Sequence, residues 1–181
     1  TYTAAMKLVI LGRDGVLNEP VDGGIRRPGD WRPIAGSLEA VAQMTQSGIR
    51  VCVVTHQPLL GSGEMGHDDL FAIHQRMQEA VNQFGGRFDA IAFNPHSEAD
   101  DRQSGKSALI QDIARRMQID AGMIPVLGDE WSDIQAARAA ATQAVLVRTG
   151  YGQATEAEHA EALANVRRVD SLHSFVQAML P

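Results

Sequence analysis

Polar residues capable of chemistry follow three of the short apolar runs of this sequence, at the points where those runs end. The three sets are Gly12-Arg13-Asp14-Gly15, Thr55-His56-Gln57 and Gly128-Asp129-Glu130-Trp131-Ser132-Asp133. Carboxylates held close together repel one another unless a cation lies among them, and hard oxygen ligands suit Mg²⁺. The sequence therefore predicts a metal or phosphate site, with Asp14, Asp129 and Asp133 as the metal ligands. Helix capping is the alternative for Asp129 and Asp133, since acids favour the first turn of a helix.

The elements that must position these residues are short apolar runs alternating with helical patterns. We expect strands over residues 8–11, 50–55, 88–93, 123–127 and 144–147. Each run is apolar at nearly every position, as expected of parallel strands covered on both faces. Their alternation with helices predicts an α/β fold, a three-layer Rossmann-like core around a mostly parallel sheet. Loops at the carboxyl ends of such strands converge on one crevice.

Helices are expected in the segments between these strands. Ser37 is the predicted N-cap of a helix that runs to Gly48, and Asp68 is the predicted N-cap of the next helix. Apolar residues recur every three or four positions from Leu70 to Phe84, which predicts a face packed against the core. Further helices are expected over residues 107–118, 132–141 and 171–180.

The composition fits one well-buried domain over residues 6–181, with residues 1–5 interpreted as a tag or a short N-terminal arm. A formal charge of −6 without long charge runs argues against nucleic acid or an anionic membrane as the partner. The one cysteine, Cys52, lies in an apolar run and is expected to be a buried core thiol. Because no signal-peptide pattern and no apolar run of membrane-spanning length occur, the expected location is the cytoplasm.

Six segments form an ordered set of motifs along the chain. They are residues 11–18 (LGRDGVLN), 28–31 (PGDW) with 33–37 (PIAGS), 53–57 (VVTHQ), 93–96 (FNPH), 127–137 (LGDEWSDIQAA) and 146–150 (LVRTG). This set resembles the capless phosphatases of the haloacid dehalogenase (HAD) superfamily, and within it the heptose bisphosphate and histidinol-phosphate phosphatases. The resemblance covers essentially residues 6–181 and implies a HAD core without a cap domain.

The resemblance also implies a reaction. In HAD phosphatases one aspartate attacks phosphorus, and a second aspartate two residues later protonates the leaving oxygen. Mg²⁺ lies against the attacking carboxylate, a main-chain carbonyl and an aspartate after the fourth strand. Matched position by position, Asp14 is the general acid/base. Arg13, Thr55 and Arg102 fall among the substrate-binding residues, and Asp129 and Asp133 on the magnesium side.

The sequence departs from the family pattern at several of these positions. Gly12 stands where the family has the attacking aspartate, so one metal ligand is lost with the nucleophile. His56 stands in place of an asparagine, and Gln103 in place of the lysine that neutralises the phosphoryl group. Lys106 is a candidate to supply the charge lost at Gln103, and we count it with the substrate-binding residues.

The zinc-binding loop of the family is also reduced in this chain. Only His96 remains as a plausible ligand, whereas a tetrahedral structural zinc site needs about four donors. We therefore expect no structural zinc, and because Gly12 removes a ligand we expect weakened binding of Mg²⁺.

These departures predict a pseudophosphatase, a HAD-like domain that binds a sugar phosphate, phosphate or a protein partner with little or no hydrolysis. Two alternatives stay open. One is an active phosphatase of altered mechanism, in which His56 accepts the phosphoryl group or a metal held by Asp14, Asp129 and Asp133 activates water. The other is a non-enzymatic structural subunit whose crevice is vestigial.

Overall fold

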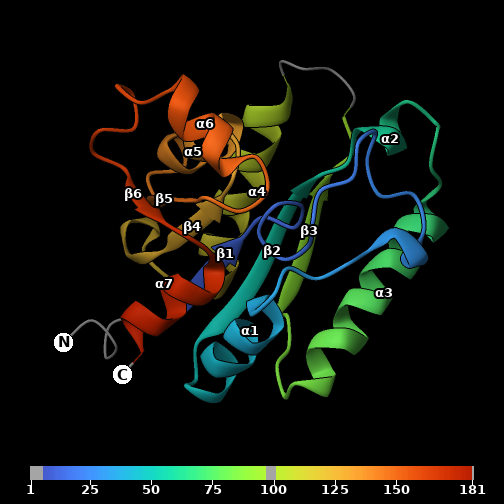
Figure 1. The fold of residues 1–181 in the computed structure, drawn as a ribbon, viewed down its shortest axis with the longest axis horizontal. Coiled ribbons are helices and arrows are strands. Elements are labelled where there is room, and N and C mark those ends of the chain that lie inside the picture. The colour runs from blue at the N-terminus through green and yellow to red at the C-terminus, as the bar shows by residue number, and fades with distance from the viewer. Residues whose placement is uncertain (1–5, 97–100, 181) are drawn as a thin grey trace.

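A single parallel sheet organises the chain. The computed structural model describes residues 6–96 and 101–180, without the side chains of Asp101 and Arg102. Within these residues the strands run in the order β3-β2-β1-β4-β5-β6, and every neighbouring pair is parallel (Figure 1). The strands are β1 (Leu8–Leu11), β2 (Arg50–His56), β3 (Ala90–Asn94), β4 (Pro125–Gly128), β5 (Gln143–Val147) and β6 (Arg167–Val169).

Helices cover both faces of this sheet. They are α1 (Ser37–Gln46), α2 (Pro58–Gly61), α3 (His67–Gln83), α4 (Asp101–Met117), α5 (Trp131–Ala139), α6 (Gly152–Glu158) and α7 (Leu172–Met179), with 3-10 turns at Pro28–Asp30 and Ala121–Met123. Helices α1, α3 and α7 pack on one face, and α4 and α5 on the other. The predicted three-layer α/β fold is confirmed, and no cap domain interrupts the described part of the chain.

Two of the three hydrophobic clusters explain why β1 is apolar throughout. Side chains alternate between the faces of a strand, so Val9 and Leu11 of β1 join the core beneath α1, α3 and α7. Leu8 and Ile10 join the core beneath α4 and α5. Cys52 lies in this second core and is fully buried, as expected. Strands β1, β2 and β4 are therefore buried on both sides, and the carboxyl ends of the strands open on one edge of the sheet.

The structure corrects several expected helix starts. Helix α4 begins at Asp101 instead of residue 107. It contains Gly105, where a side chain would not fit, because a Cβ would lie 2.3 Å from the Asn94 side-chain nitrogen. Helix α1 is preceded by Gly36 with φ 83°, and Ser37 instead donates its hydroxyl proton to the Val16 carbonyl. Helix α3 starts at His67, where the Gly66 N–H donates to the Asp69 carboxylate. The last helix, expected over residues 171–180, is α7, and the Ser171 side chain caps it by accepting the N–H of Ser174.

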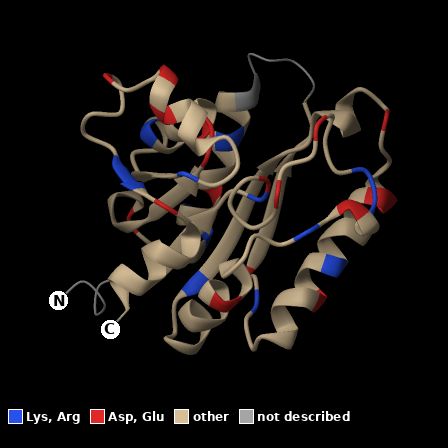
Figure 2. Ribbon diagram, in the orientation of Figure 1, with Lys and Arg blue, Asp and Glu red and all other residues tan. Residues whose placement is uncertain are grey.

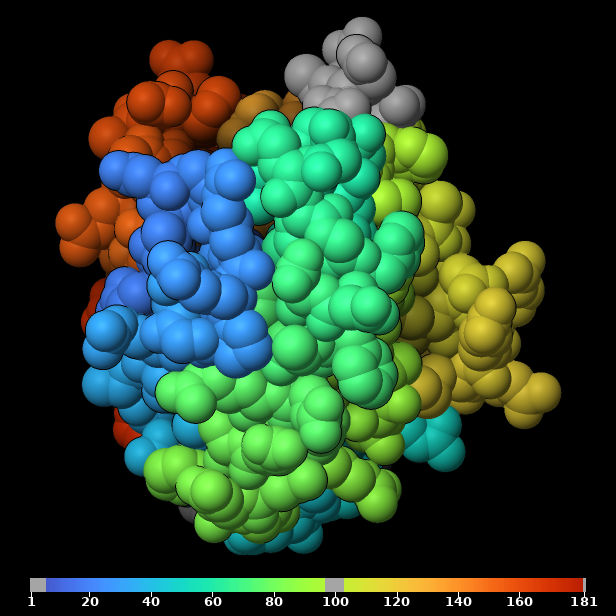
Figure 3. Space-filling model, turned by 90° about the vertical axis from the view of Figure 1, so that its right-hand side faces the viewer, coloured from blue at the N-terminus to red at the C-terminus, as the bar shows by residue number. Residues whose placement is uncertain are grey.

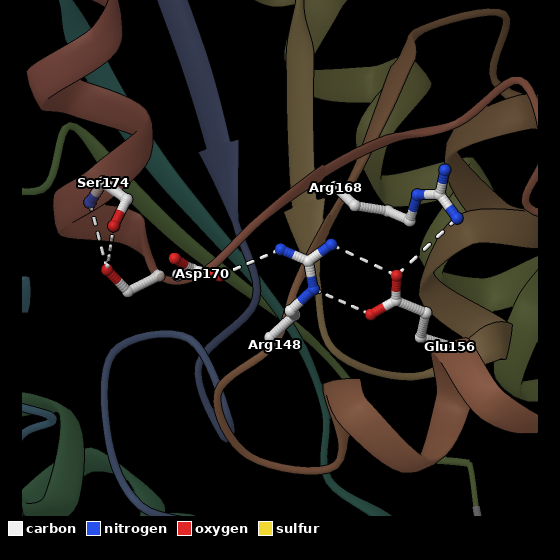
Figure 4. A network of polar contacts seen from close by, with 6 residues as sticks. Arg148, Glu156, Arg168, Asp170 and Ser174 are labelled. Carbon is white, nitrogen blue, oxygen red and sulfur yellow. Dashed lines mark hydrogen bonds and ion pairs between the residues drawn. The ribbon is translucent and has the colours of Figure 1, made fainter.

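Three elements escape the sequence patterns: α2, α6 and the edge strand β6. Strand β6 carries two arginines in three residues, so it lacks the apolar run that identifies a buried strand. Ion pairs hold this part of the fold together (Figure 4). Arg148 donates to Glu156 of α6 at 2.7 and 3.2 Å and to Asp170 at 2.9 Å, and Arg168 lies 3.6 Å from Glu156. The network fixes α6 beside the ends of β5 and β6.

Charge and polarity are spread over the fold. Figure 2 shows acidic and basic residues interspersed along the helices and loops. In residues 6–96 and 101–180, no helix combines the length and the apolar character that crossing a membrane requires.

Candidate functional site

A crevice of about 360 Å³ opens where the loops after β1, β2 and β4 meet. Eight of the predicted site residues line it: Gly12, Arg13, Asp14, Thr55, His56, Lys106, Asp129 and Asp133. Gln103 lies in α4 but is not among the lining residues, and the side chain of Arg102 falls outside the described residues. Glu130 and Tyr151 also line the crevice, together with the loop that contains Val21 and Gly24.

Gly12 lies where the crevice meets the end of β1. Its N–H donates to the carbonyl of Leu127 at 2.9 Å, which ties β1 to β4. A Cβ added at this residue would lie 3.3 Å from Val16 and 3.5 Å from the Leu127 carbonyl oxygen. A side chain is therefore accommodated with a shift of a few tenths of an ångström. The glycine leaves this position without a nucleophile, although the backbone has space for one.

Asp14 is held by three neighbouring side chains. Arg13, whose side chain is buried, donates to both carboxylate oxygens at 3.0 and 3.1 Å, and Asn18 donates to one of them at 2.9 Å. Burial alone raises the pKa of Asp14, but the charge of Arg13 and hydrogen bonds from Arg13, Asn18 and Gln57 bring it below its ordinary value. Asp14 is thus an ionised carboxylate at neutral pH, whereas a general acid must hold a proton.

Behind Arg13 lies a histidine whose role is not predictable from the sequence. His74 of α3 places Nε2 3.3 Å from the Arg13 guanidinium. Burial and the charge of Arg13 lower the pKa of His74 to about 4, despite the opposing effect of Asp14. The imidazole is therefore neutral at pH 7 and accepts a hydrogen bond from Arg13. Only the contact with Arg13 reveals this role, because in the sequence His74 is one polar residue among several on an amphipathic helix.

The loop after β2 supplies a hydroxyl and an imidazole. Thr55 accepts a hydrogen bond from the Gln57 amide at 2.9 Å, so its own proton can be donated elsewhere. The Asn94 amide oxygen faces the N–H of His96 at 3.4 Å, and its nitrogen faces His56 Nδ1 at 3.1 Å. In this arrangement Nδ1 is an acceptor and the ring proton resides on Nε2.

The loop after β4 presents the two remaining acids. Oδ2 of Asp133 accepts the N–H groups of Asp129 at 3.2 Å and Glu130 at 3.1 Å, while Oδ1 pairs with Lys106. Burial raises the pKa of Asp133, but the Lys106 charge and these hydrogen bonds more than reverse the effect. The capping alternative for Asp133 therefore describes its backbone contacts correctly.

Asp129 has a different environment. Its Oδ2 accepts the N–H of Tyr151 at 2.9 Å, and Thr155 donates to its backbone carbonyl at 2.7 Å. Burial, and then the charge of Asp133, raise the pKa of Asp129 to about 8. Gly15 approaches it so closely, with φ 82°, that a Cβ there would lie 1.9 Å from Oδ2. This packing fixes the loop after β1 against the loop after β4.

The rim of the crevice is built from segments distant in sequence. Arg26 donates to Glu64 at 2.9 Å, and a Cβ on Gly24 would lie 3.0 Å from Leu59. Figure 3 shows the segment around residues 20–30, in blue, against the segment around residues 58–66, in teal. On the other side the Tyr151 hydroxyl lies 3.5 Å from Asp22.

The described donors do not form the ligand set that the resemblance implies for Mg²⁺. Residue 12 offers no carboxylate, and Asp129 and Asp133 each have an oxygen bonded to protein N–H groups. Among the residues described, no three histidine, cysteine or acidic side chains come close enough together to hold a metal ion. In the zinc-loop region, residues 97–100 lie outside the described part, and His96 is exposed.

Known proteins share this fold and much of this sequence. A family model described as HAD-hydrolase-like matches residues 104–174. The D-glycero-β-D-manno-heptose-1,7-bisphosphate 7-phosphatase of Bordetella bronchiseptica is 40% identical over 155 residues, covering 84% of this chain and 87% of the relative. The enzyme of the same name from Neisseria meningitidis is 36% identical over 178 residues, covering 97% and 95%.

Solved structures agree with these sequence relationships. The D,D-heptose 1,7-bisphosphate phosphatase from B. bronchiseptica, complexed with magnesium and phosphate, superposes with a TM-score of 0.90 at 36% identity, covering 97% of this chain and 98% of that one. The Burkholderia thailandensis enzyme gives a TM-score of 0.72 at 35% identity, covering 96% and 98%. The chain described here therefore belongs to the HAD superfamily, in the family of the heptose-1,7-bisphosphate 7-phosphatases.

Proposed function

We propose that this chain is a pseudophosphatase, a HAD-like domain that binds a phosphorylated sugar or phosphate and hydrolyses it far more slowly than the family route allows. The observation that carries the proposal is Gly12, which lines the crevice at the position of the family nucleophile. Loss of one preorganised electrostatic donor costs about 10²–10³ in rate, and loss of a nucleophile generally costs more.

The crevice retains groups suited to an anionic ligand. Thr55 has a hydroxyl proton to donate, and Lys106, which pairs with Asp133, also lines the crevice, three residues along the chain from Gln103. The B. bronchiseptica relative, at 36% identity, is a complex with phosphate. A phosphorylated sugar is the ligand class that this relationship supports.

The same relative also contains magnesium. In this chain we propose that Mg²⁺ binding is weakened, because the carboxylate at residue 12 is absent and the acids after β4 are bonded to protein donors. We propose no structural zinc. The metal and zinc positions are tested together by elemental analysis of the purified protein, where stoichiometric zinc would contradict this part of the proposal.

A phosphoryl transfer to His56 is the main competing mechanism. Its Nδ1 faces the Asn94 amide nitrogen at 3.1 Å, so the ring proton resides on Nε2. This contact supports a hydrogen-bonding role for His56.

Turnover assays on matched variants test the proposed function. Wild-type protein is expected to release phosphate from D-glycero-D-manno-heptose 1,7-bisphosphate at least about 10²–10³-fold more slowly than the double variant Gly12→Asp/Gln103→Lys. Gly12→Asn is the control, because it restores the size and polarity of aspartate without a nucleophile. Intact-protein mass spectrometry should detect an aspartyl-phosphate in the double variant alone.

Binding is measured separately by isothermal titration with inorganic phosphate and with the heptose bisphosphate. Rapid phosphate release by wild-type protein, or a phosphohistidine at His56 during turnover, would contradict the proposal in favour of an active phosphatase. Failure of every phosphorylated ligand to bind, together with recovery of a stable protein partner in pull-downs, would favour the structural-subunit alternative.

A further inference from the structure

Tyr151 lies between two hollows of the molecule. One is the crevice of about 360 Å³, and the other is a neighbouring hollow of about 380 Å³, which we call the side groove. The side groove is lined by residues of α5 and of the segment around α6, including Trp131 and His159. Among the described residues, Glu130 and Tyr151 line both hollows. These two residues therefore mark the boundary between the crevice and the side groove.

Contacts at its backbone and at its hydroxyl fix the position of Tyr151. The backbone N–H donates to Oδ2 of Asp129 at 2.9 Å, which anchors the residue to the acids of the crevice. The hydroxyl lies 3.5 Å from Asp22, in the loop that forms part of the crevice rim. The ring therefore extends from the loop after β5 towards the loop after β1, along the boundary with the side groove.

The side groove has the chemistry of a site for a neutral sugar. The indole of Trp131 and the imidazole of His159 stack with their centroids 4.6 Å apart and their planes 10° apart, which gives the groove a flat apolar wall. Gln135 and Glu158 supply acceptors for hydroxyl protons. Its described lining contains no lysine or arginine, so the groove suits hydroxyl groups better than a phosphoryl group.

From this geometry we propose that the Tyr151 ring is a specificity-determining barrier, which closes the crevice off from the side groove and restricts the ligand to a single phosphorylated sugar unit. The inference rests on the proposed function for the phosphoryl group in the crevice. At about 360 Å³ the crevice is at the small end of the range for ligand sites, about 300–1,000 Å³. Specificity of this kind comes from a clash with the longer ligand, and not from a new contact with the shorter one.

Isothermal titration with three ligands tests the inference. Inorganic phosphate probes the phosphoryl position alone, D-mannose 6-phosphate adds one sugar unit, and trehalose 6-phosphate adds two. Wild type is expected to bind trehalose 6-phosphate at least about tenfold more weakly than mannose 6-phosphate, because the second unit meets the ring. In Tyr151→Ala this difference should shrink by about tenfold, while the affinity for inorganic phosphate is unchanged.

Two control variants separate the ring from its hydroxyl and from exposed rings in general. Tyr151→Phe keeps the ring and loses the contact with Asp22, so it should retain the selectivity of wild type. Phe71→Ala removes a 71% exposed ring on α3 and should change none of the three affinities. Equal selectivity in Tyr151→Ala and wild type would overturn the inference, as would a loss of selectivity in Tyr151→Phe.

A double variant shows where the second sugar unit lies. His159 lines the side groove and not the crevice, so Tyr151→Ala/His159→Ala should lose affinity for trehalose 6-phosphate relative to Tyr151→Ala. Its affinity for mannose 6-phosphate should be unchanged. A gain that survives the second substitution in full would place the added unit outside the side groove and contradict the inference.

A crystal structure of Tyr151→Ala provides a readout that needs no ligand. Tyr151 is 43% exposed, and alanine keeps the N–H that Asp129 accepts, so the variant is expected to fold. The two hollows should be joined in it, and hollows still separated by Glu130 would show that Tyr151 is not the barrier. Wild type that fails to bind inorganic phosphate would defeat the proposed function, whereas phosphate binding without discrimination between the two sugar phosphates would defeat this inference alone.

Discussion

Arg13 and Asp14 are neighbours in the chain and also ion-pair partners, with the guanidinium donating to one carboxylate oxygen at 3.0 Å and to the other at 3.1 Å. The arginine side chain is completely buried, and His74 accepts from its far side. Adjacent residues rarely face one another in regular structure. Here the tight loop after β1, closed by the Gly15 N–H to the Asn18 carbonyl at 2.8 Å, brings the two side chains together.

Because of this arrangement, we expect substitution of Arg13 to reduce the free energy of unfolding more than other substitutions in the loop after β1. Arg13→Met keeps much of the volume but leaves Asp14 without its partner, and we expect a loss of about 2–3 kcal/mol of unfolding free energy. The control is Arg27→Met, because Arg27 pairs with Asp30 on the surface with 80% of its side chain exposed and should change stability by less than about 0.5 kcal/mol. Urea denaturation measures both, and equal effects would contradict the structural role of Arg13.

His74 predicts a specific dependence of stability on pH. Its folded pKa of about 4 lies below the ordinary 6.5, so between these values the unfolded chain binds more protons. Stability is therefore complete above about pH 6.5 and falls as the pH decreases towards 4, by about 2 kcal/mol between pH 7 and pH 5.

The variant His74→Gln should lose this pH-dependent part of the stability, because glutamine can still accept a hydrogen bond from Arg13 but does not titrate. His96→Gln, at an exposed residue, is the matched control and should retain the wild-type dependence. Asp14 acts at lower pH, because its contribution is present above its ordinary pKa of 3.8 and is lost as the pH falls through its lowered folded value. Identical urea midpoints for wild type and His74→Gln across pH 5–7 would contradict the assignment.

Substitution by alanine should affect stability differently at Gly12 and at Gly15, three residues further along the chain. Gly12→Ala has space for the new methyl group, and we expect a change within about 1 kcal/mol because the smaller backbone entropy of the unfolded chain offsets the close contact with Val16. Gly15→Ala must hold φ 82° and would drive Cβ into the Asp129 carboxylate, so a loss above about 3 kcal/mol is expected. Thermal unfolding by calorimetry compares them, and a Gly12→Ala variant as damaged as Gly15→Ala would show that residue 12 does not tolerate a side chain.

Thr55 should contribute directly to the binding of an anion. Thr55→Val keeps the shape of the side chain but cannot donate a proton, and we expect phosphate affinity to fall by about tenfold or more, as for other hydrogen bonds to charged groups. Thr55→Ser retains the hydroxyl and should bind within a few-fold of wild type. Isothermal titration with inorganic phosphate distinguishes them, and equal affinities for the valine and serine variants would remove Thr55 from the binding site.

Much of the fold could be predicted because the central strands β1, β2 and β4 are buried on both faces. Their continuous apolar runs mark β1 and β2 almost to the residue, and the polar sets that follow them do converge on one crevice. Strand β6 lacked this signal because an edge strand with two exposed arginines does not need to be apolar. The start of α4 was predicted too late because Gly105 is a weak helix former, and the close approach of Asn94 leaves no room for a side chain at this residue.

The sequence predicted most of the candidate residues that line the crevice, but it did not predict the contacts between them. Spacing along the chain placed Asp129 and Asp133 together, yet it could not reveal that Lys106 of another helix pairs with one of them. The role of His74 was hidden for the same reason, because its partner Arg13 lies 61 residues away. Contacts of this kind depend on how helices are placed over the sheet, which no local pattern encodes.

The order of the strands has a consequence for biosynthesis. Strand β1 leaves the ribosome first but lies at the centre of the sheet, and its partner β4 pairs Leu127 with Leu11 across more than a hundred residues of chain. At roughly 5–20 residues per second, this neighbour emerges on the order of ten seconds later. Until then Gly12 has no carbonyl to bond, and the nascent polypeptide has no pocket to offer a ligand.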